Sequence, residues 1–428
     1  MPIGLDERCL KRLRQGLAEQ IPEFTLRHGW NLDRPSLSGL LELEKALPNK
    51  AELKASLEKF INETPLFDYV YGQLSKELND FEEFDSESKQ SRLVDNPKYS
   101  DAEALATRLI AEFEALPRSY RFTFRLNSEL STHFRGPEYK LTESIRLVRP
   151  SPEFADQFPL GSEIPGRDRW LHGGGLLGLA GPKEWNEQSI YLQVESHGFV
   201  GKWTSTTPEE SAVSILKSVL GTCLAIRAFR HRYAYSPTTI KQRAYVHEQA
   251  DGRWQLYDSI ELDEPLSNVL SELVLDDLEG SLDTDLKKGS FLINRLKLLE
   301  KAWSDEAVNE RILLAGKWLL DSYSGKSELL SFVQATVALE ILLGDKAVSD
   351  LIGLGELLRN RCAYLVGKTH AQRNEILEDF KKIYDIRSKI VHRGKDRLKR
   401  HERELLYTLR WLVSRVIQEE LERIERDA

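Results

Sequence analysis

The chain has 428 residues, and this length favours two or three domains over a single hydrophobic core. Of its residues, 41% are hydrophobic and 30% are charged, as in an ordinary water-soluble globular protein. The formal net charge of −8 argues against a protein that coats nucleic acid over its whole surface, so a site for a polyanion should be local.

Cysteine usage and hydropathy indicate in which cellular compartment the protein is expected. Cys9, Cys223 and Cys362 are far apart and include no CxxC pair, which excludes a disulfide framework and a cysteine-rich zinc site. No stretch comes near the roughly 18 consecutive apolar residues of a membrane span, and the first residues lack the apolar core of a secretory signal. We therefore expect a cytoplasmic protein with no membrane contact.

The predicted elements divide the chain into three parts and indicate a multidomain α+β protein. Residues 1–117 have leucines at helical spacing and form a predicted N-terminal helical region, whose last helix begins at a Ser-Asp cap and ends before Pro117. Residues 118–300 change period, since Tyr120–Leu126 alternates apolar and polar residues as a half-buried strand does. Further β-rich segments flank a helix predicted from Thr207 to Phe229, so this part is expected to be a sensing or regulatory α+β domain with mainly antiparallel strands.

The third part, residues 301–428, is predicted to be an all-α helical bundle. Its apolar spacing indicates five helices, which are Glu306–Tyr323, Ser327–Leu343, Asp350–Val366, Ala371–Arg393 and Glu402–Glu425.

An arginine interrupts the apolar stripe of the fourth of these helices. The stripe runs through Ile376, Phe380 and Ile383 and should continue near position 387 before Ile390, but Arg387 occupies that position. A guanidinium cannot lie alone in a dry core, because nothing would offset the loss of its hydration. Arg387 therefore needs a carboxylate, a phosphate or a water-lined cleft.

A histidine follows five positions later, inside a strongly basic stretch. From Arg387 to Arg400 the chain holds seven Lys/Arg and one Asp, a net charge of +6. Gly394 is a predicted C-terminal cap, which would place His392 in the last helical turn. The helix dipole favours a protonated histidine and the neighbouring cations favour the neutral form, so the charge stays open. Five residues on a regular helix correspond to a rotation of about 140°, so the two residues share a site only if the helix end is distorted or if two chains bring their helices together.

These segments resemble a known family. The spacing Arg387-x4-His392 is similar to the signature of HEPN ribonucleases, and Val337–Asp345, Leu357–Gly367 and Phe380–Gly394 are similar in order and spacing to the ApeA-like HEPN subgroup. The resemblance covers about residues 305–428 and nothing before them. It implies a metal-independent endoribonuclease without a cofactor, working as a homodimer in which the two R-x4-H helices face each other.

The chemistry of these residue types agrees with that implication. RNA carries its own nucleophile in the 2′-hydroxyl. His392 would supply a general acid or base near neutral pH, and the fork of Arg387 would stabilise the charge that develops on the phosphate. The residues expected to orient the histidine or to hold flanking RNA phosphates are Ser388, Lys389, Arg393 and Lys395. For Lys389 and Arg393 a solvated basic face is an equally good interpretation.

Glu340 and the remaining parts of the chain have expected roles too. Glu340 lies within an apolar helix and is expected to form a structural ion pair with Arg361 or Arg387. By resemblance, such multidomain proteins act as toxins in bacterial antiviral or abortive-infection defence, so residues 1–300 would sense a trigger, phage-derived or other. The alternative is a non-catalytic HEPN protein that dimerises or binds RNA or another partner, with Arg387 and His392 structural.

Other patterns predict no site. The nine histidines show no HExxH motif and no Cys/His spacing suited to zinc, so no metal is expected. The glycine-rich segment Leu171–Pro182 lacks a G-x-S-x-G elbow or a following G-K-[ST] and is expected to be a loop or strand edge. His197, His231 and His247 are expected to be surface histidines or buried ones with satisfied hydrogen bonds.

An acidic segment precedes the basic part of the chain. From Trp254 to Leu286 there are ten Asp/Glu and no Lys/Arg. The segment is either a solvated face or a restraint that docks near the Arg387–Arg400 surface and competes with RNA phosphates.

Overall fold

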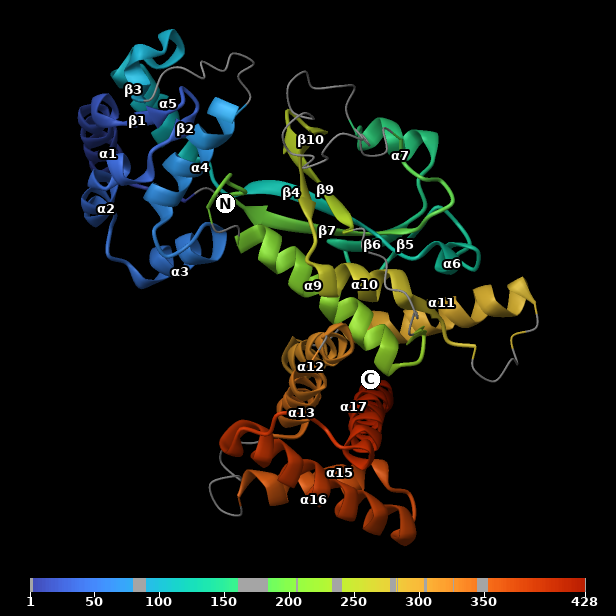
Figure 1. The fold of residues 1–428 in the computed structure, drawn as a ribbon. Helices are drawn as coiled ribbons and strands as arrows, with labels where there is room; N and C mark the ends of the chain where they lie inside the picture. The colour runs from blue at the N-terminus through green and yellow to red at the C-terminus, as the bar shows by residue number, and fades with distance from the viewer. Residues whose placement is uncertain are drawn as a thin grey trace.

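The structure is a computed structural model of the chain. It describes residues 3–79, 90–160, 184–204, 207–232, 241–277, 282, 284–303, 306–325, 327–344 and 353–427. Helices combine with antiparallel sheets, and the C-terminal region is helical, as predicted (Figure 1). In the described part of the chain, no helix is both long enough and apolar enough to span a membrane.

The N-terminal region is mainly helical, as predicted. Its helices are α1 Glu7–Gln20, α2 Gly39–Leu43, α3 Ala51–Phe60, α4 Pro65–Asn79 and α5 Ala102–Glu114. Short 3-10 turns connect them: η1 Ile21–Glu23, η2 Arg34–Leu37, η3 Glu44–Ala46, η4 Leu93–Asp95 and η5 Pro97–Tyr99. The predicted cap of α5 is confirmed, because Asp101 Oδ1 accepts a 2.9 Å hydrogen bond from the Ala104 amide.

A small antiparallel sheet in this region is not predicted from the sequence. It has the strand order β2-β1-β3, with strands β1 Thr25–Arg27, β2 Asn31–Leu32 and β3 Gln90–Arg92. Strands of two or three residues are too short to show an alternating pattern, so local periodicity cannot reveal them.

The central sheet has the strand order β10-β9-β4-β7-β6-β5, and all its neighbouring strands are antiparallel. The strands are β4 Arg118–Arg125, β5 Glu138–Lys140, β6 Ile145–Val148, β7 Tyr191–Gly198, β9 Arg243–Ala250 and β10 Arg253–Glu261. The predicted strand is confirmed as β4, in which Tyr120, Phe122 and Phe124 are fully buried. The strand was expected to be half-buried, but Arg121 and Thr123 on its other face are buried as well. Phe122 is in register with Val194 of β7 and Val246 of β9, so these apolar residues share one face of the sheet.

Helix α9 (Thr207–Ala225) lies along this apolar face (Figure 1). The prediction extended it to Phe229, but the helix ends at Ala225 and Phe229 begins the short strand β8. The other described elements of this part are α6 Ser128–Ser131, α7 Pro152–Gln157, α10 Glu264–Glu272 and the antiparallel pair β8 Phe229–His231 and β11 Leu273–Leu275.

The C-terminal region consists of α11 Asp285–Lys301, α12 Glu306–Ser324, α13 Glu328–Leu343, α15 Leu354–Val366, α16 His370–Arg393 and α17 Arg400–Asp427. Four of the five predicted helices agree with α12, α13, α16 and α17 within a few residues. The remaining predicted helix, Asp350–Val366, corresponds to α15, which begins at Leu354. Residues 350–352 lie outside the described ranges. Helix α11 is not among the predicted helices.

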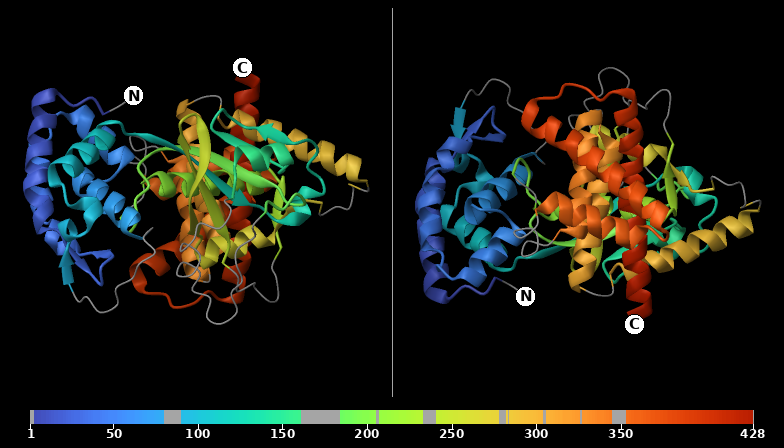
Figure 2. Two further views of the ribbon diagram at one scale, coloured as in Figure 1. Left: turned by 90° about the horizontal axis from the view of Figure 1, so that it is seen from above. Right: turned by 90° about the horizontal axis from the view of Figure 1, so that it is seen from below.

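A close helix crossing joins the sheet to the C-terminal helices. A Cβ atom placed on Gly221 of α9 would lie 1.8 Å from the Gly316 carbonyl oxygen of α12, so only glycine fits there. One hydrophobic cluster accordingly continues from the sheet through α9 into the C-terminal helices, across the predicted division at residue 300. A second cluster contains Leu116 and the N-terminal helices, and Phe199 is its one member from beyond the predicted division at residue 117. Figure 2 shows the N-terminal helices standing beside the rest of the molecule in both views.

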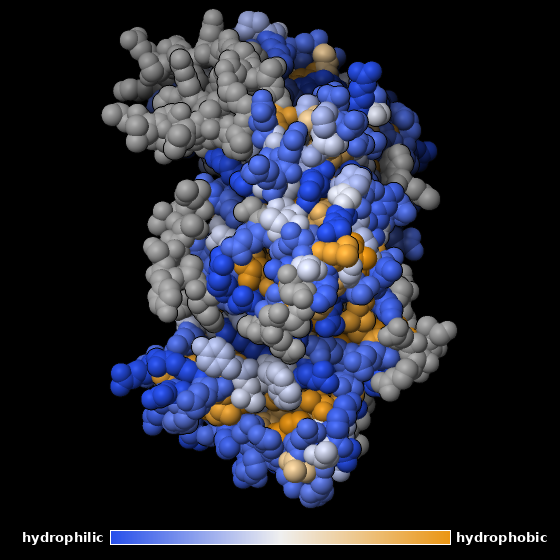
Figure 3. All heavy atoms as spheres, turned by 90° about the vertical axis from the view of Figure 1, so that its right-hand side faces the viewer, coloured by the Kyte–Doolittle hydropathy of each residue, from blue (hydrophilic) through white to orange (hydrophobic). Residues whose placement is uncertain are grey.

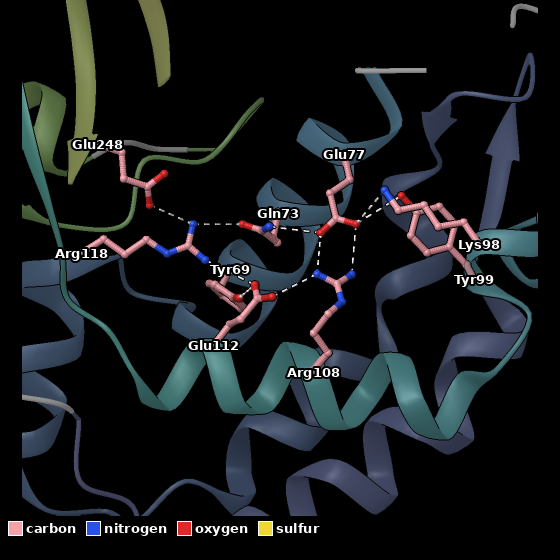
Figure 4. A network of polar contacts seen from close by, with 9 residues as sticks. All are labelled: Tyr69, Gln73, Glu77, Lys98, Tyr99, Arg108, Glu112, Arg118 and Glu248. Atoms are coloured by element: carbon pink, nitrogen blue, oxygen red, sulfur yellow. Dashed lines mark hydrogen bonds and ion pairs between the residues drawn. The ribbon is translucent and has the colours of Figure 1, made fainter. Parts of the chain in front are cut away.

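A chain of charged contacts connects the N-terminal region to the central sheet (Figure 4). The guanidinium of Arg118, the first residue of β4, lies 3.3 Å from a Glu112 carboxylate oxygen of α5 and 3.4 Å from one of Glu248 in β9. Arg108 extends the chain, because it lies 2.8 Å from Glu77 and 3.1 Å from Glu112. These ion pairs hold α4 and α5 against the N-terminal end of β4.

Candidate functional site

Helix α16 carries the predicted site, and caps define both of its ends. At the start, the Thr369 hydroxyl accepts from the Gln372 amide at 3.2 Å, and the Gln372 side chain accepts from the Thr369 amide at 3.2 Å. At the end, Gly394 adopts the left-handed conformation with φ 62° and ψ 39°, and its amide donates to the Lys389 carbonyl oxygen. The predicted C-terminal cap is confirmed, and His392 lies in the last helical turn.

Arg387 forms an ion pair inside the helical bundle. Its Nε lies 3.5 Å from Glu340 Oε1 of α13, and the Tyr384 hydroxyl donates a 2.9 Å hydrogen bond to the same oxygen. Burial, followed by the charge of Glu340, raises the pKa of Tyr384 well above its ordinary value, so this hydroxyl stays protonated and remains a donor. The sequence analysis required a carboxylate, a phosphate or a water-lined cleft beside the Arg387 guanidinium. The structure shows a carboxylate, that of Glu340.

Arg361, the other predicted partner of Glu340, contacts the end of the same helix. Its Nη1 donates a 2.9 Å hydrogen bond to the carbonyl oxygen of Leu343, the last residue of α13. The final carbonyl groups of a helix lack helical partners and carry partial negative charge, so a guanidinium is favourable there. Arg361 and Arg387 therefore both lie beside the C-terminal end of α13.

His392 lies on a different side of α16 from Arg387. The helix is continuous from His370 to Arg393, so its end is not distorted and about 140° separate the two residues around the axis. The His392 side chain is exposed and has no hydrogen-bond or ion-pair partner among the described residues. One chain alone therefore does not bring the two predicted catalytic residues into one site.

Ser388 and Val391 occupy the helix surface between these two residues. Val391 follows Arg387 by four positions, about 40° around the axis, and Ser388 precedes His392 by four, again about 40°. Val391 is 47% exposed and presents an apolar surface to solvent. A second helix that covered Ser388 and Val391 would have Arg387 on one side and His392 on the other.

The cations predicted to hold flanking RNA phosphates differ in whether a carboxylate of the same chain already pairs with them. Lys389 Nζ lies 2.5 Å from Asp385 Oδ2, one turn earlier on the helix. Lys395 Nζ lies 3.0 Å from Glu402 Oε1, and these side chains are only 14% and 6% exposed. Burial would raise the pKa of Glu402, but a backbone hydrogen bond and the Lys395 ammonium outweigh it and hold this pKa below its ordinary value. Lys395 thus fixes the loop after α16, whereas Arg393 is exposed and has no partner among the described residues.

Two exposed rings on α17 are not among the predicted site residues. Tyr407 and Trp411 are 60% and 51% exposed, and both line a groove of about 650 Å³ between α16 and α17. Ile376 and Leu412 also line this groove, and both are buried. The spacing of the two rings, one helical turn apart, is visible in the sequence, but the groove beside them depends on how α16 and α17 pack.

Of the three histidines of the central part, His197 is on the surface and His231 and His247 have buried side chains. The expected satisfied hydrogen bonds are only partly present, because Nδ1 of His247 has no hydrogen-bond partner among the described residues. His247 is fully buried and donates from Nε2 to the Pro159 carbonyl oxygen at 3.0 Å, and burial lowers its pKa to about 4. His231 Nε2 lies 2.6 Å from Glu272 Oε2, and the His197 side chain is half exposed. Within the described ranges, no group of three or more His, Cys, Asp or Glu side chains is placed to hold a metal ion. The glycine-rich segment at 171–182 lies outside the described residues.

The described part of the acidic segment lies far from the basic stretch. Asp276 of the acidic segment pairs with Arg227, and its Oδ2 lies 3.0 Å from Arg227 Nε. Arg227 follows Ala225 by two residues, and the Ala225 carbonyl oxygen accepts a 2.6 Å hydrogen bond from Gln418 of α17. Arg400 begins α17 eighteen residues before Gln418, which is about 27 Å along a helix. The described residues thus show no docking of the acidic segment on the basic stretch. Two of its carboxylates, Glu279 and Asp283, lie outside the described ranges.

Comparison of the chain with models of known protein families, with curated proteins and with solved structures finds no match.

Proposed function

We propose that the chain is a metal-independent endoribonuclease in which two copies together build a site from Arg387 and His392. The observation that supports this proposal most is the state of His392, which is exposed at the end of α16 and has no partner among the described residues. A surface histidine next to several cations is suited to proton transfer on a bound polyanion.

The proposed reaction uses the substrate's own 2′-hydroxyl. One His392 imidazole accepts the proton of the 2′-hydroxyl, whose oxygen attacks the adjacent phosphorus atom. The bond from phosphorus to the 5′ oxygen breaks, and the second, protonated His392 gives that oxygen a proton. The products are a 2′,3′-cyclic phosphate and a 5′-hydroxyl, and no redox partner or metal is required to balance the step.

The proposed role of Arg387 is to stabilise negative charge on the phosphate oxygens. Its Nε is directed at Glu340, but a guanidinium has five N–H donors, so the ion pair leaves other donors for a phosphate. Glu340 and Tyr384 then hold the fork in place before the substrate arrives, which lowers the cost of organising the site.

The proposed dimer follows from the arrangement of side chains around α16. If two α16 helices meet over Ser388 and Val391, the Arg387 and His392 side chains of both chains border the contact. The exposed Val391 would supply the apolar centre of such a contact. Arg387 and His392 of one chain are about 140° apart around the axis of α16, so a second chain is needed to bring the two residue types to one site. The proposed dimer supplies that second chain.

The proposed biological setting comes from the resemblance of residues 305–428 to the ApeA-like HEPN subgroup. We propose a role in bacterial antiviral or abortive-infection defence, with residues 1–300 sensing a trigger. The glycine crossing of α9 and α12 supports this idea physically, because a shift of α9 would be transmitted directly to the C-terminal helices.

A specific observation also favours the second candidate function, a non-catalytic module that dimerises or binds RNA. The Arg387–Glu340–Tyr384 cluster gives the guanidinium a counter-charge within one chain, as a structural arginine requires.

The two candidates are separated by incubating the purified chain with total RNA and with tRNA in the presence of EDTA and sequencing the new ends. The proposed enzyme should cleave under these conditions and leave 2′,3′-cyclic or 3′-phosphate ends. A 2′-deoxy substitution at the scissile nucleotide should block the cut. Strict Mg²⁺ dependence or 5′-phosphate products would refute the mechanism, and binding without cleavage would favour the non-catalytic candidate.

A further inference from the structure

The outer surface of α17 combines exposed cations, exposed rings and a groove, and we infer that it binds single-stranded RNA next to the proposed cleavage site. The position of the cut relative to this surface rests on the proposed function. The binding itself rests on the features described next.

The first feature is a group of exposed cations where α16 passes into α17. Arg393 and Arg397 are exposed and have no partner among the described residues. Arg400 is 95% exposed, and its Nε is 3.9 Å from Glu404 Oε1, the outer limit of an ion pair. Phosphate groups of RNA can therefore displace only water and counterions here, which is the usual source of affinity for a nucleic-acid backbone.

The second feature is a line of aromatic rings that continues from these cations. Tyr407 follows Arg400 by seven residues and Trp411 follows Tyr407 by four, so all three lie within about 40° on one side of α17. Both rings are more than half exposed, and each offers a face on which a base can stack. The line from Arg400 to Trp411 is eleven residues, or about 16 Å, which is enough for several nucleotides.

The third feature is the groove beside the rings. Its apolar residues Val366, Ile376 and Leu412 are buried at the junction of α15, α16 and α17. On the lower part of the molecule, where these helices lie, Figure 3 shows apolar atoms gathered among polar ones. A groove of about 650 Å³ with an apolar lining is large enough for a base that leaves the stack.

Charge around the groove indicates how RNA would lie. Glu375 and Asp379 of α16 line the groove, so phosphates are disfavoured inside it. Their carboxylates can accept hydrogen bonds from the exocyclic amino groups of cytosine, adenine or guanine, which uracil lacks. At the other end of the groove, Lys368 and Arg415 each lie 2.8 Å from Glu419, so these two cations share one carboxylate and are partly neutralised. The bases should therefore point toward the groove and the phosphates toward Arg397 and Arg400.

A docked protein is the competing occupant of this surface. Exposed Trp and Tyr side chains are also common at protein interfaces. The exposed cations that continue the line of rings favour RNA, because stacking and backbone charge are the two components of single-strand recognition.

The test measures RNA binding separately from cleavage. Binding of fluorescent 12-nucleotide oligo(C) and oligo(U) RNA is followed by anisotropy at several salt concentrations, in a His392→Ala background that does not cut the probe. The variants are Tyr407→Ala, Trp411→Ala, their Phe counterparts and the double variant Arg397→Gln/Arg400→Gln. Tyr364→Ala is the matched control, since Tyr364 is an exposed ring on α15 that does not line the groove.

We expect each ring-to-alanine change to weaken oligo(C) binding about five-fold or more without changing its salt dependence, and the Phe variants to restore most of the affinity. The double arginine variant should lower the slope of log Kd against log salt by about 1.4, or about 0.7 for each lost phosphate contact on a single strand. Oligo(U) should bind more weakly than oligo(C), and Tyr364→Ala should bind like its parent.

Equal binding by the ring variants and their parent would overturn the inference, whether or not the wild-type chain cuts RNA. RNA binding through the rings by a wild-type chain that cuts nothing would uphold it and refute the proposed enzyme. Loss of self-association in the ring variants, with RNA binding unchanged, would assign the surface to a protein contact instead.

Discussion

Charged side chains serve different purposes at the two ends of the molecule. In the N-terminal network each charge has an opposite partner, and Arg118 joins Glu112 of α5 to Glu248 of β9 (Figure 4). At the start of α17, Arg393 and Arg397 are exposed without a partner among the described residues. The contrast distinguishes charges that hold the fold from charges that remain available to a ligand.

The same contrast divides the basic stretch itself. Arg387, Lys389 and Lys395 each pair with a carboxylate of the same chain. The sequence allowed a role on RNA for all three, beside an ion pair with Glu340 for Arg387 and a solvated basic face for Lys389. His392 and Arg393 have no such carboxylate partner in the part of the chain that the structure describes. A high density of positive charge in the sequence is therefore a poor guide to which cations a substrate can reach.

The largest expected effect concerns the two proposed catalytic residues. His392→Ala should reduce RNA cleavage by about 10²- to 10⁴-fold and leave the free energy of unfolding unchanged, because the side chain is exposed and unpartnered among the described residues. Arg387→Ala should reduce cleavage and also destabilise the chain, because it leaves Glu340 without its cation. Cleavage assays and urea titrations of both variants check this. Wild-type cleavage by a folded His392→Ala variant would refute the assignment.

The second-largest expected effect is the loss of stability when Arg118 is removed from the N-terminal ion-pair network. Arg118→Met should lower the free energy of unfolding by about 3 kcal/mol, since Glu248 would lose its cation and Glu112 would keep only Arg108, which it shares with Glu77. Arg397→Met is the matched control at the other end of the molecule and should change it by less than about 0.5 kcal/mol. Equal effects in urea titrations would mean that the contrast between the two regions has no energetic basis.

A smaller effect is expected at a buried polar group of the central sheet. Burial lowers the pKa of His247 to about 4, below the roughly 6.5 of an unfolded histidine. The stability that the neutral ring contributes is therefore complete above about pH 6.5 and is lost as the pH falls toward 4. Between pH 7 and pH 4.5, His247→Gln should lose about 2 kcal/mol less stability than the wild type. An identical pH dependence of the two unfolding free energies would contradict the shift.

The smallest expected effect is on self-association. Val391→Glu should weaken the proposed dimer about ten-fold or more, because it places a charge in the apolar centre of the contact. Leu286→Glu is the matched control, since Leu286 is an exposed leucine on α11. Sedimentation equilibrium separates the two variants, and equal self-association would remove Val391 from the interface.

Local patterns in the sequence predicted the elements that local physics determines. The alternation from Tyr120 onward, the Asp101 cap and the Gly394 cap are all confirmed, because each depends on neighbours within a few residues. The end of α9 and the short strand β8 were not predicted, since β8 is three residues long and pairs with the distant β11.

The candidate site was predictable in its residues but not in its geometry. That Arg387 needed a partner followed from the apolar stripe, but the choice of Glu340 depends on how α13 and α16 pack. The exposure of Trp411 likewise depends on which side of α17 the other helices cover. The contact of Gly221 with Gly316 joins residues 95 positions apart (316 − 221), so no local pattern reveals it.

The claim that two chains complete one site is tested most directly by mixing Arg387→Ala and His392→Ala. Equimolar variants are unfolded together, refolded and assayed for RNA cleavage in EDTA beside each variant alone. We predict that the mixture cleaves RNA well above either variant, because mixed dimers bring one intact Arg387 and one intact His392 to one phosphate, whereas each variant alone lacks one of the two residue types entirely. Because the second His392 is missing from a mixed dimer, its cleavage should stay below that of the wild type. Cleavage no higher than that of the single variants, in a mixture shown to contain mixed dimers and with an active wild type, would contradict the claim.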